Sequence, residues 1–157
     1  KNAAITACAA VTLAASSLRV AWDGCPVLVL GWGRIGKCLA AMLKALGARV
    51  CVAVRKEQDR AILSALDYDA VDITAPEHIL GRFRVIFNTV PHPVLTAAHS
   101  SLCRKDCLKI DLASKAGIAG EDVIIARGLP GKYLPESSGK LIAQTILKYF
   151  VREEGSL

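Results

Sequence analysis

Aromatic residues are scarce in this chain of 157 residues, which contains two tryptophans, three tyrosines and three phenylalanines. Basic residues do not cluster either, because the densest groups are pairs such as Arg104 and Lys105. Proteins that bind nucleic acids usually combine a clustered basic face with aromatic side chains. We therefore expect no nucleic-acid partner. The net charge of +6 is instead compatible with small anionic ligands.

Metal-binding and disulfide patterns are missing from the six cysteines. No two of them form a C-x-x-C pair, and Cys103 and Cys107 lack histidines at zinc-ligand spacing. Cysteines inside apolar segments, such as Cys38 and Cys51, usually pack as small hydrophobic residues. We expect reduced thiols, a cytoplasmic location and no metal site.

No apolar run is long enough to span a bilayer, and we expect no membrane association. The most apolar stretch, residues 3–15, is rich in alanine, follows a lysine and imitates a secretory signal peptide. Because its alanine content suits a helix, we prefer a docked or truncated N-terminal helix, with secretion as the alternative. We treat residues 1–157 as a single domain and expect a fragment that lacks an N-terminal substrate or catalytic domain.

Short apolar runs alternate with helical patterns along the rest of the chain. The runs are rich in Val, Ile and Leu, as strands covered on both faces must be. We predict strands at 27–30, 49–54, 70–73, 84–90, 108–112 and 123–126, and helices at 35–46, 56–66, 94–102 and from Ser137 or Ser138 onward. A short helical segment is predicted to start at Pro76 and end near Leu80. This alternation indicates an α/β fold with a doubly wound parallel sheet, preceded by the N-terminal helix.

A glycine motif follows the first predicted strand directly and has the form G-x-G-x-x-G, from Gly31 through Gly33 to Gly36. In a dinucleotide site Gly31 permits the tight turn, Gly33 lets a pyrophosphate approach the backbone, and Gly36 lets helix and strand pack closely. The start of the next helix supplies N–H donors and a partial positive charge to the phosphates. The motif predicts a Rossmann-type NAD(P)-binding domain, and a glycine-rich turn kept only for packing is the alternative.

An acid is missing where NAD-binding domains usually carry one. The second strand of such domains ends in Asp or Glu, which binds the hydroxyl groups of the adenosine ribose. Here residues 50–54 are followed by Arg55 and Lys56. A guanidinium or ammonium group suits a 2′-phosphate by charge and by hydrogen-bonding geometry. The pair therefore favours NADP over NAD, and exposed basic residues at a helix start are the alternative interpretation.

Three further strand ends meet at the same edge of the predicted sheet, where open α/β sheets bind their ligands. We expect cofactor contacts from the residues that follow the fourth, fifth and sixth strands, which are Thr89, Val90, Pro91, Asp111, Ser114, Leu129 and Pro130. For Thr89 and Ser114 the alternative is local turn chemistry. No catalytic set of side chains is recognisable, so the catalytic residues stay unknown. His92 lies in one of these loops, but a histidine between two prolines is at least as often a plain loop residue.

Several motifs of the chain occur together in one known family. They are Gly31–Gly36, Asn88–Pro91, Asp111–Lys115, Gly128–Gly131 and Pro135–Gly139. In this combination the sequence resembles the nucleotide-binding domain of the dipicolinate synthase A chain family over essentially its whole length. The stretch from Ala126 to Ala143 is the most specific part, because a proline–glycine loop leads into a helix with a Ser-Gly start. The first motif is shared more widely, notably with D-2-hydroxyacid dehydrogenases.

The resemblance implies an enzyme that oxidises dihydrodipicolinate to dipicolinate with NADP during sporulation, in the cytoplasm of the mother cell. It also implies a small dicarboxylate substrate and, as the partner, the flavoprotein-like B chain of dipicolinate synthase. The family has an N-terminal domain that closes over the cofactor, so we expect this chain alone to be inactive. By the same resemblance Arg34 and Ile35 would lie over the pyrophosphate, Arg55 near the adenosine ribose, and Thr89, Ser114 and Leu129 toward the nicotinamide.

Two alternatives differ in what the cofactor would do. The first is the cofactor domain of a D-2-hydroxyacid dehydrogenase, a family that carries a catalytic arginine, glutamate and histidine. The matching stretch here offers Arg127 and Glu136 without a convincing histidine, and His92 departs from the dipicolinate synthase pattern. The second is a non-catalytic module that senses the nucleotide and reports to a partner. The sequence leaves a homo-oligomer open.

Overall fold

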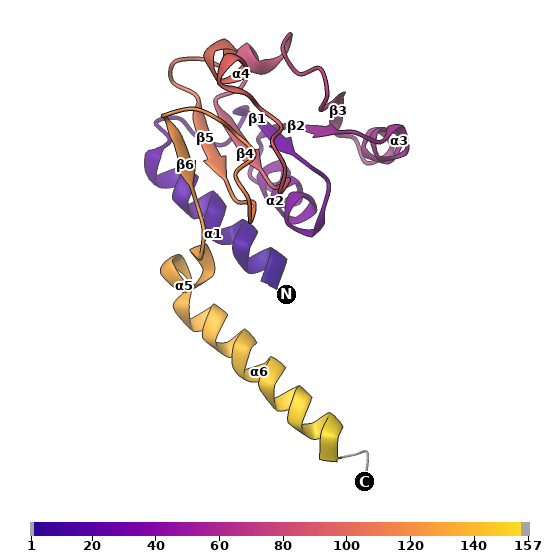
Figure 1. Ribbon diagram of the computed structural model, residues 1–157, viewed down its shortest axis with the longest axis vertical. Coiled ribbons are helices and arrows are strands. Elements are labelled where there is room, and N and C mark those ends of the chain that lie inside the picture. The colour runs from indigo at the N-terminus through magenta and orange to yellow at the C-terminus, as the bar shows by residue number, and fades with distance from the viewer. Residues whose placement is uncertain (1, 155–157) are drawn as a thin grey trace.

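The computed structural model describes residues 2–154, and their side chains as far as Gln144. Its centre is a six-stranded sheet with the order β3-β2-β1-β4-β5-β6, in which all neighbours are parallel (Figure 1). The strands are β1 (Pro26–Leu30), β2 (Arg49–Val54), β3 (Asp69–Asp72), β4 (Val85–Asn88), β5 (Leu108–Asp111) and β6 (Val123–Ile125). The helices are α1 (Asn2–Ser17), α2 (Arg34–Ala45), α3 (Glu57–Ala65), α4 (Ala97–Leu102), α5 (Leu129–Tyr133) and α6 (Pro135–Glu154), with a 3₁₀ turn η1 (Leu80–Arg82) before β4.

The sheet changes direction at β1. From β1 the chain runs outward through β2 to β3, then returns to the other side of β1 and continues through β4 and β5 to β6. The connections that leave β1 and β4 therefore head to opposite faces of the sheet and leave a crevice at the carboxyl ends of these two strands. The predicted doubly wound parallel sheet is confirmed. Within the described residues, no helix has both the length and the apolar character that crossing a membrane requires.

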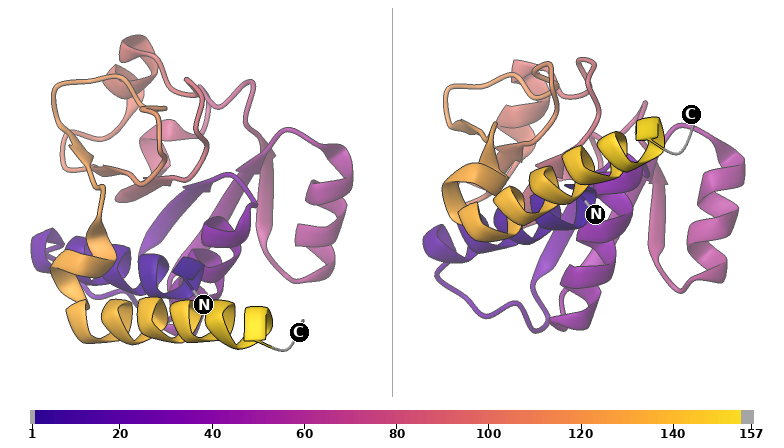
Figure 2. Two further views of the ribbon diagram at one scale, coloured as in Figure 1. Left: turned by 60° about the horizontal axis from the view of Figure 1, so that its bottom comes forward. Right: turned by 90° about the horizontal axis from the view of Figure 1, so that it is seen from below.

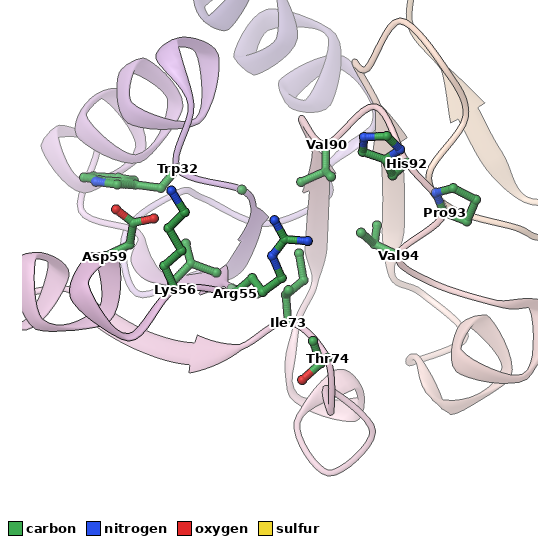
Figure 3. A pocket seen from close by; sticks show the side chains of 13 residues that line it. Trp32, Arg55, Lys56, Asp59, Ile73, Thr74, Val90, His92, Pro93 and Val94 are labelled. Atoms are coloured by element: carbon green, nitrogen blue, oxygen red, sulfur yellow. The ribbon is translucent and has the colours of Figure 1, made fainter.

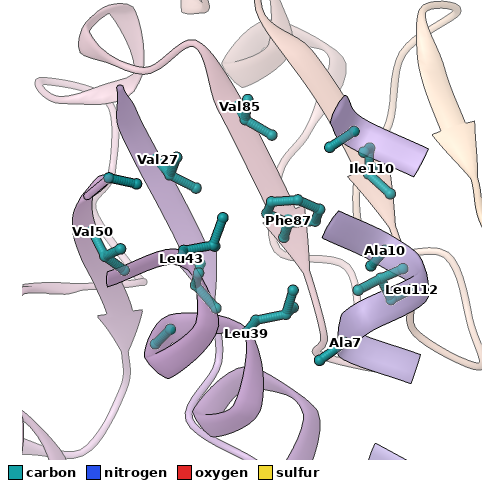
Figure 4. Packing of buried hydrophobic residues seen from close by; sticks show 14 of the residues in the cluster. Ala7, Ala10, Val27, Leu39, Leu43, Val50, Val85, Phe87, Ile110 and Leu112 are labelled. Atoms are coloured by element: carbon teal, nitrogen blue, oxygen red, sulfur yellow. The ribbon is translucent and has the colours of Figure 1, made fainter. Parts of the chain in front are cut away.

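One face of the sheet is covered by α1, α2 and α3. Leu39 and Leu43 of α2 are completely buried there, and Phe87 of β4 lies at the centre of the cluster (Figure 4). Helix α1 joins this layer through buried alanines, among them Ala7 and Ala10, whose small side chains let the helix approach α2 closely. The predicted docked N-terminal helix is therefore present. Burial of this apolar surface is the main force that holds the layer on the sheet.

The opposite face is covered by η1, α4 and the loops around them. Leu28 and Ile86 of the central strands pack there against Leu80 and Leu95. At the end of the chain, α5 contacts α1, and α6 also contacts α1 but then projects away from the rest of the molecule (Figure 1 and Figure 2). Helix α5 is one element that the sequence patterns do not predict.

Most predicted strands and helices are present with their ends shifted by one or two residues, but three helix predictions need correction. The segment from Pro76 is a turn rather than a helix, closed by a hydrogen bond of 3.0 Å from Ile79 N to Pro76 O, and it leads into η1. Helix α4 begins only at Ala97, because Thr96 caps it. Helix α6 begins at Pro135 rather than at a serine, since the fixed φ of proline suits a first helical turn.

We predict that Phe87→Ala destabilises the domain by about 3–5 kcal/mol, because truncating a fully buried ring removes apolar contacts and leaves a cavity. Urea unfolding followed by circular dichroism measures the change. Ile62→Ala is the matched control, since this side chain on α3 is 51% exposed, and we expect a change below about 1 kcal/mol. Equal losses in the two variants would contradict a core centred on Phe87.

Candidate nucleotide-binding site

Gly31 closes the turn between β1 and α2 at the crevice. Its φ of +97° lies in the left-handed region that favours glycine, and its N–H donates to the Ala53 carbonyl at 2.9 Å. A Cβ atom on Gly31 would lie 2.7 Å from both Thr89 Oγ1 and Val90 Cγ2. Both the backbone conformation and the space around it therefore require glycine at this position.

Gly36 and Gly33 face very different surroundings. A Cβ atom on Gly36, in the first turn of α2, would strike the carbonyl oxygen of Gly31, so close packing of the helix on the turn requires glycine there. A Cβ atom on Gly33 would meet nothing within 4 Å. Gly33 is the N-cap of α2, and no side chain caps the helix at this end. The first N–H groups of α2 are thus free to bind an anion such as a pyrophosphate, which the open surface at Gly33 can approach.

A hollow of about 320 Å³ lies beside this helix start. Arg34 and Ile35 of α2 and Thr89 of the loop after β4 line it, together with the first residues of α1. Thr89 donates to the Leu30 carbonyl twice, from Oγ1 at 2.8 Å and from N at 3.0 Å. These bonds fasten the loop after β4 to the end of β1. The structure therefore brings Arg34, Ile35 and Thr89 together next to the glycine turn.

A larger cavity of about 560 Å³ opens between the carboxyl ends of β1, β2, β3 and β4. Arg55 and Lys56, which follow β2, belong to its wall. Figure 3 shows the Arg55 guanidinium pointing into the cavity above Ile73, and the Lys56 side chain pointing toward Trp32. The basic pair that stands in place of the usual acid is thus part of the same cavity as the glycine turn.

The loop after β4 forms the opposite wall of this cavity. Val90, His92, Pro93 and Val94 line it, and Ile73 adds a further apolar side chain (Figure 3). A slot with apolar walls and a basic edge suits the base and the phosphates of a nucleotide. Among these wall residues, only Val90 is predicted from the sequence to contact the cofactor. The pair of prolines that flanks His92, directly after a strand, is the sequence feature from which the other wall residues could have been predicted.

Arg60 on α3 holds the basic edge of the cavity in place. Its guanidinium donates to the Arg55 carbonyl at 3.2 Å and pairs with the Asp72 carboxylate at 3.2 Å, so it joins the ends of β2 and β3. Hydrogen bonds from Thr74 hold the pKa of Asp72 below its ordinary value, and Arg60 acts in the same direction. Asp59, one residue earlier on α3, adds a single acidic group to the cavity wall.

Asp111 is completely buried at the end of β5. Its Oδ1 accepts hydrogen bonds from Asn88 Nδ2 and Ala113 N, both at 3.0 Å. Its Oδ2 accepts from Gly117 N at 2.7 Å and from Ile118 N at 3.1 Å. Protein donors thus enclose the carboxylate, and Asp111 lines neither cavity, so the cofactor contact predicted there stays a prediction that this geometry does not support. Asp111 instead holds together the loops that follow β4 and β5.

Four other predicted contacts lie away from both cavities. Leu129 is 3% exposed and belongs to the core cluster with α1, so the cofactor contact predicted there likewise stays without support from the geometry. Pro130 lies in the first turn of α5. Pro91 and Ser114 are exposed on their loops, and the Ser114 carbonyl accepts a hydrogen bond from Arg127 Nη1. In the described part of the chain, no group of three His, Cys, Asp or Glu side chains is arranged as a metal site.

Comparison with known families agrees with this geometry. The model of the D-isomer specific 2-hydroxyacid dehydrogenase NAD-binding domain matches residues 13–110. The chain belongs to this family. The match runs from within α1 to within β5 and so includes the glycine turn and both walls of the larger cavity. The domain is thus an NAD-binding domain of the oxidoreductase class, which confirms the predicted Rossmann-type domain and its nicotinamide cofactor.

Individual relatives agree with the resemblance seen in the motifs. The A chain of dipicolinate synthase from Bacillus subtilis (strain 168) is 29% identical over 143 residues, which covers 84% of this chain and 48% of that protein. The crystal structure of the dipicolinate synthase A chain from Bacillus halodurans, 29% identical, has a TM-score of 0.89 over 94% of this chain and 54% of the other. That of the corresponding protein from Bacillus subtilis, 26% identical, has a TM-score of 0.92 over 99% and 55%. The present chain therefore spans about half the length of these relatives.

Alanine substitutions should separate the roles of the two glycines. We expect Gly33→Ala to weaken nucleotide binding at least about tenfold, because the methyl group enters the face that a pyrophosphate approaches. Its free energy of unfolding should change by less than about 1 kcal/mol. Gly36→Ala should lower that free energy by about 1–3 kcal/mol, because the methyl group strikes the Gly31 carbonyl.

Calorimetric titration with NADP+ and NAD+ measures the binding, and urea unfolding measures the stability. Gly131→Ala on α5 is the control, since a Cβ atom there would also meet nothing within 4 Å but lies outside both cavities. If Gly33→Ala bound nucleotide as tightly as the unmodified chain, the helix start would not be the pyrophosphate site.

Proposed function

We propose that this chain is the cofactor-binding domain of an enzyme similar to the A chain of dipicolinate synthase, and that this enzyme oxidises dihydrodipicolinate to dipicolinate with NADP. The observation that carries the proposal is the agreement with two dipicolinate synthase structures along almost the whole chain, at TM-scores of 0.89 and 0.92. The second support is local. Arg55 and Lys56 stand in the nucleotide cavity where an NAD-specific site would carry an acid.

In this function the chain's own groups bind and orient the dinucleotide. The uncapped start of α2 receives the pyrophosphate over Gly33. Arg55 pairs with the 2′-phosphate through charge-assisted hydrogen bonds, and its carbonyl is held by Arg60 while it does so. The apolar wall at Val90 and Val94 holds the adenine and excludes water from it. A dinucleotide held by these residues would supply the hydride acceptor for the oxidation of the substrate ring, and aromatisation of that ring would drive the reaction.

The remaining parts of the proposed enzyme are a second domain and a partner. Because the chain spans about half the length of its relatives, we infer that a small dicarboxylate substrate binds between this domain and an N-terminal one. Cationic groups must hold its carboxylates, and Arg127, at the exposed loop edge beside Ser114, is of the right charge. The proposed partner is the flavoprotein-like B chain of dipicolinate synthase, and the proposed location is the mother-cell cytoplasm during sporulation.

A D-2-hydroxyacid dehydrogenase reaction is supported less well by the side chains, although the domain belongs to that wider family. Such enzymes use a histidine together with an arginine and a glutamate. Here His92 lines the nucleotide cavity. His99 caps α4 and contacts Glu77 at 3.1 Å. Both histidines thus lie in surroundings other than a catalytic centre shared with Arg127.

We predict that Arg55→Ala lowers the affinity for NADP+ at least about tenfold, equivalent to about 1.4 kcal/mol, and changes the affinity for NAD+ by less than about twofold. The reason is that only NADP+ carries the 2′-phosphate that this guanidinium would bind. Calorimetric titration of both nucleotides provides the measurement. Arg19→Ala is the matched control, because this exposed arginine lies in the wall of a different cavity. Equal affinity of the unmodified chain for both nucleotides would remove the case for NADP.

Turnover distinguishes an enzyme from a nucleotide sensor. We expect a chain of the relatives' full length, mixed with its flavoprotein-like partner, to produce NADPH from NADP+ in the presence of dihydrodipicolinate. NADPH absorbance reports the rate, and the same mixture with Gly33→Ala is the control. Tight binding of NADP+ without any turnover in this mixture would favour the sensor.

A further inference from the structure

Two thiols lie close together at the edge of the sheet opposite to the nucleotide cavity. Cys103 is the residue at which α4 ends, and Cys107 immediately precedes β5. A tight turn joins them, closed by a hydrogen bond of 3.0 Å from Cys107 N to Arg104 O. Both residues also pack on the same apolar cluster beneath α4. Neither thiol has any part in the proposed binding of the cofactor.

The two cysteines differ in burial, and the more buried one borders an open cavity. Cys103 is half-buried, and its Sγ donates to the His99 carbonyl at 3.6 Å. Cys107 is 7% exposed, but it belongs to the wall of an open cavity of about 370 Å³ that Arg84 and Lys105 also line. A small oxidant can therefore approach Cys107 through this cavity, whose wall carries the basic side chains of Arg84 and Lys105 and the acidic ones of Asp106 and Asp122.

A buried cation acts on the thiol pair. Lys109, two residues after Cys107, has a side chain that is 2% exposed, and its Nζ lies 2.6 Å from Asp122 Oδ2. A buried ammonium group needs anionic partners, and the carboxylate of Asp122 is itself 63% exposed. Besides pairing with Asp122, the positive charge of Lys109 lowers the pKa of both neighbouring thiols, Cys103 and Cys107.

The two thiols differ in acidity because of this arrangement. The neighbouring Cys107 side chain, together with the charge of Lys109, lowers the pKa of Cys103 to about 7, against the opposing effects of burial and Asp122. The Cys103 side chain and burial raise the pKa of Cys107, where Asp106 adds to the effect. The lowered pKa makes Cys103 ionise more readily than an ordinary thiol, and the thiolate is the reactive form.

We propose that Cys103 and Cys107 are a hydroperoxide-sensitive dithiol site that closes reversibly to a disulfide. Cys103 attacks one oxygen of the hydroperoxide, the O–O bond breaks, and the departing oxygen takes up a proton, which leaves a sulfenic acid on Cys103. The Cys107 sulfur then attacks the Cys103 sulfur, so that an S–S bond forms, the S–O bond breaks and water leaves with the Cys107 proton. The two thiols lose two electrons in total, and the hydroperoxide gains them.

The chain offers a direct test, because Arg104 and Lys105 lie between the two cysteines. Trypsin cleaves after both residues, so the peptides 85–104 and 106–109 stay together only if a disulfide joins them. We expect hydrogen peroxide at neutral pH to remove two hydrogen atoms from the protein and to yield this linked pair. Dithiothreitol should separate the two peptides again. Mass spectrometry of the intact and digested chain measures both steps.

Variants identify the attacking sulfur. In Cys107→Ser the disulfide cannot form, and we expect dimedone to trap a sulfenic acid at Cys103. Cys8→Ser is the matched control, because it removes an exposed thiol on α1 and should leave the linked peptides unchanged. The proposal is overturned if oxidation occurs first at Cys8 or Cys38, or if the peptides 85–104 and 106–109 stay separate. The digest of the unmodified chain decides this even if a variant fails to fold.

Discussion

The buried carboxylate of Asp111 is the constraint on which the carboxyl edge of the sheet depends. A buried charge is tolerated only where protein donors replace the water it has lost. Three backbone N–H groups and the Asn88 amide do so here, and they belong to the ends and loops of β4 and β5. Gly117 lets the loops after β4 and β5 pack closely, since a Cβ atom there would lie 2.7 Å from the His92 carbonyl oxygen and 2.9 Å from the Val90 carbonyl oxygen. Asp111 thus stabilises one wall of the nucleotide cavity although its own side chain does not line that cavity.

The two sides of the cavity match the two halves of the nucleotide that the family binds. The side formed by the ends of β1 and β2 offers N–H groups and cations, which suit phosphates. The side formed by the loop after β4 offers apolar surface, which suits a planar base. This division follows from the strand order. Because the chain leaves β1 and β4 toward opposite faces of the sheet, two loops of different composition come to flank one crevice.

The opposite edge of the sheet contains different chemistry. There the thiols of Cys103 and Cys107, the ammonium of Lys109 and the carboxylate of Asp122 form a polar cluster at the start of β5. Helix α4 lies between the two regions, since it follows the loop that contains His92 and ends at Cys103. A disulfide at Cys103 would therefore constrain the last turn of α4, the helix that follows the wall-forming loop after β4.

The sequence by itself determined the sheet class, the order of elements and the glycine turn, because strand length, apolar runs and glycine spacing depend on neighbours along the chain. It also located Arg55 and Lys56, since the residue after a strand must lie at the edge of the sheet. Only the tertiary structure decided which of the remaining side chains face the crevice. Asp111 and Leu129 follow their strands as a ligand contact would, yet packing encloses both. His92, Ile73 and Val94 line the cavity because distant strands converge there, and burial and contact between distant residues leave no local pattern in a single sequence.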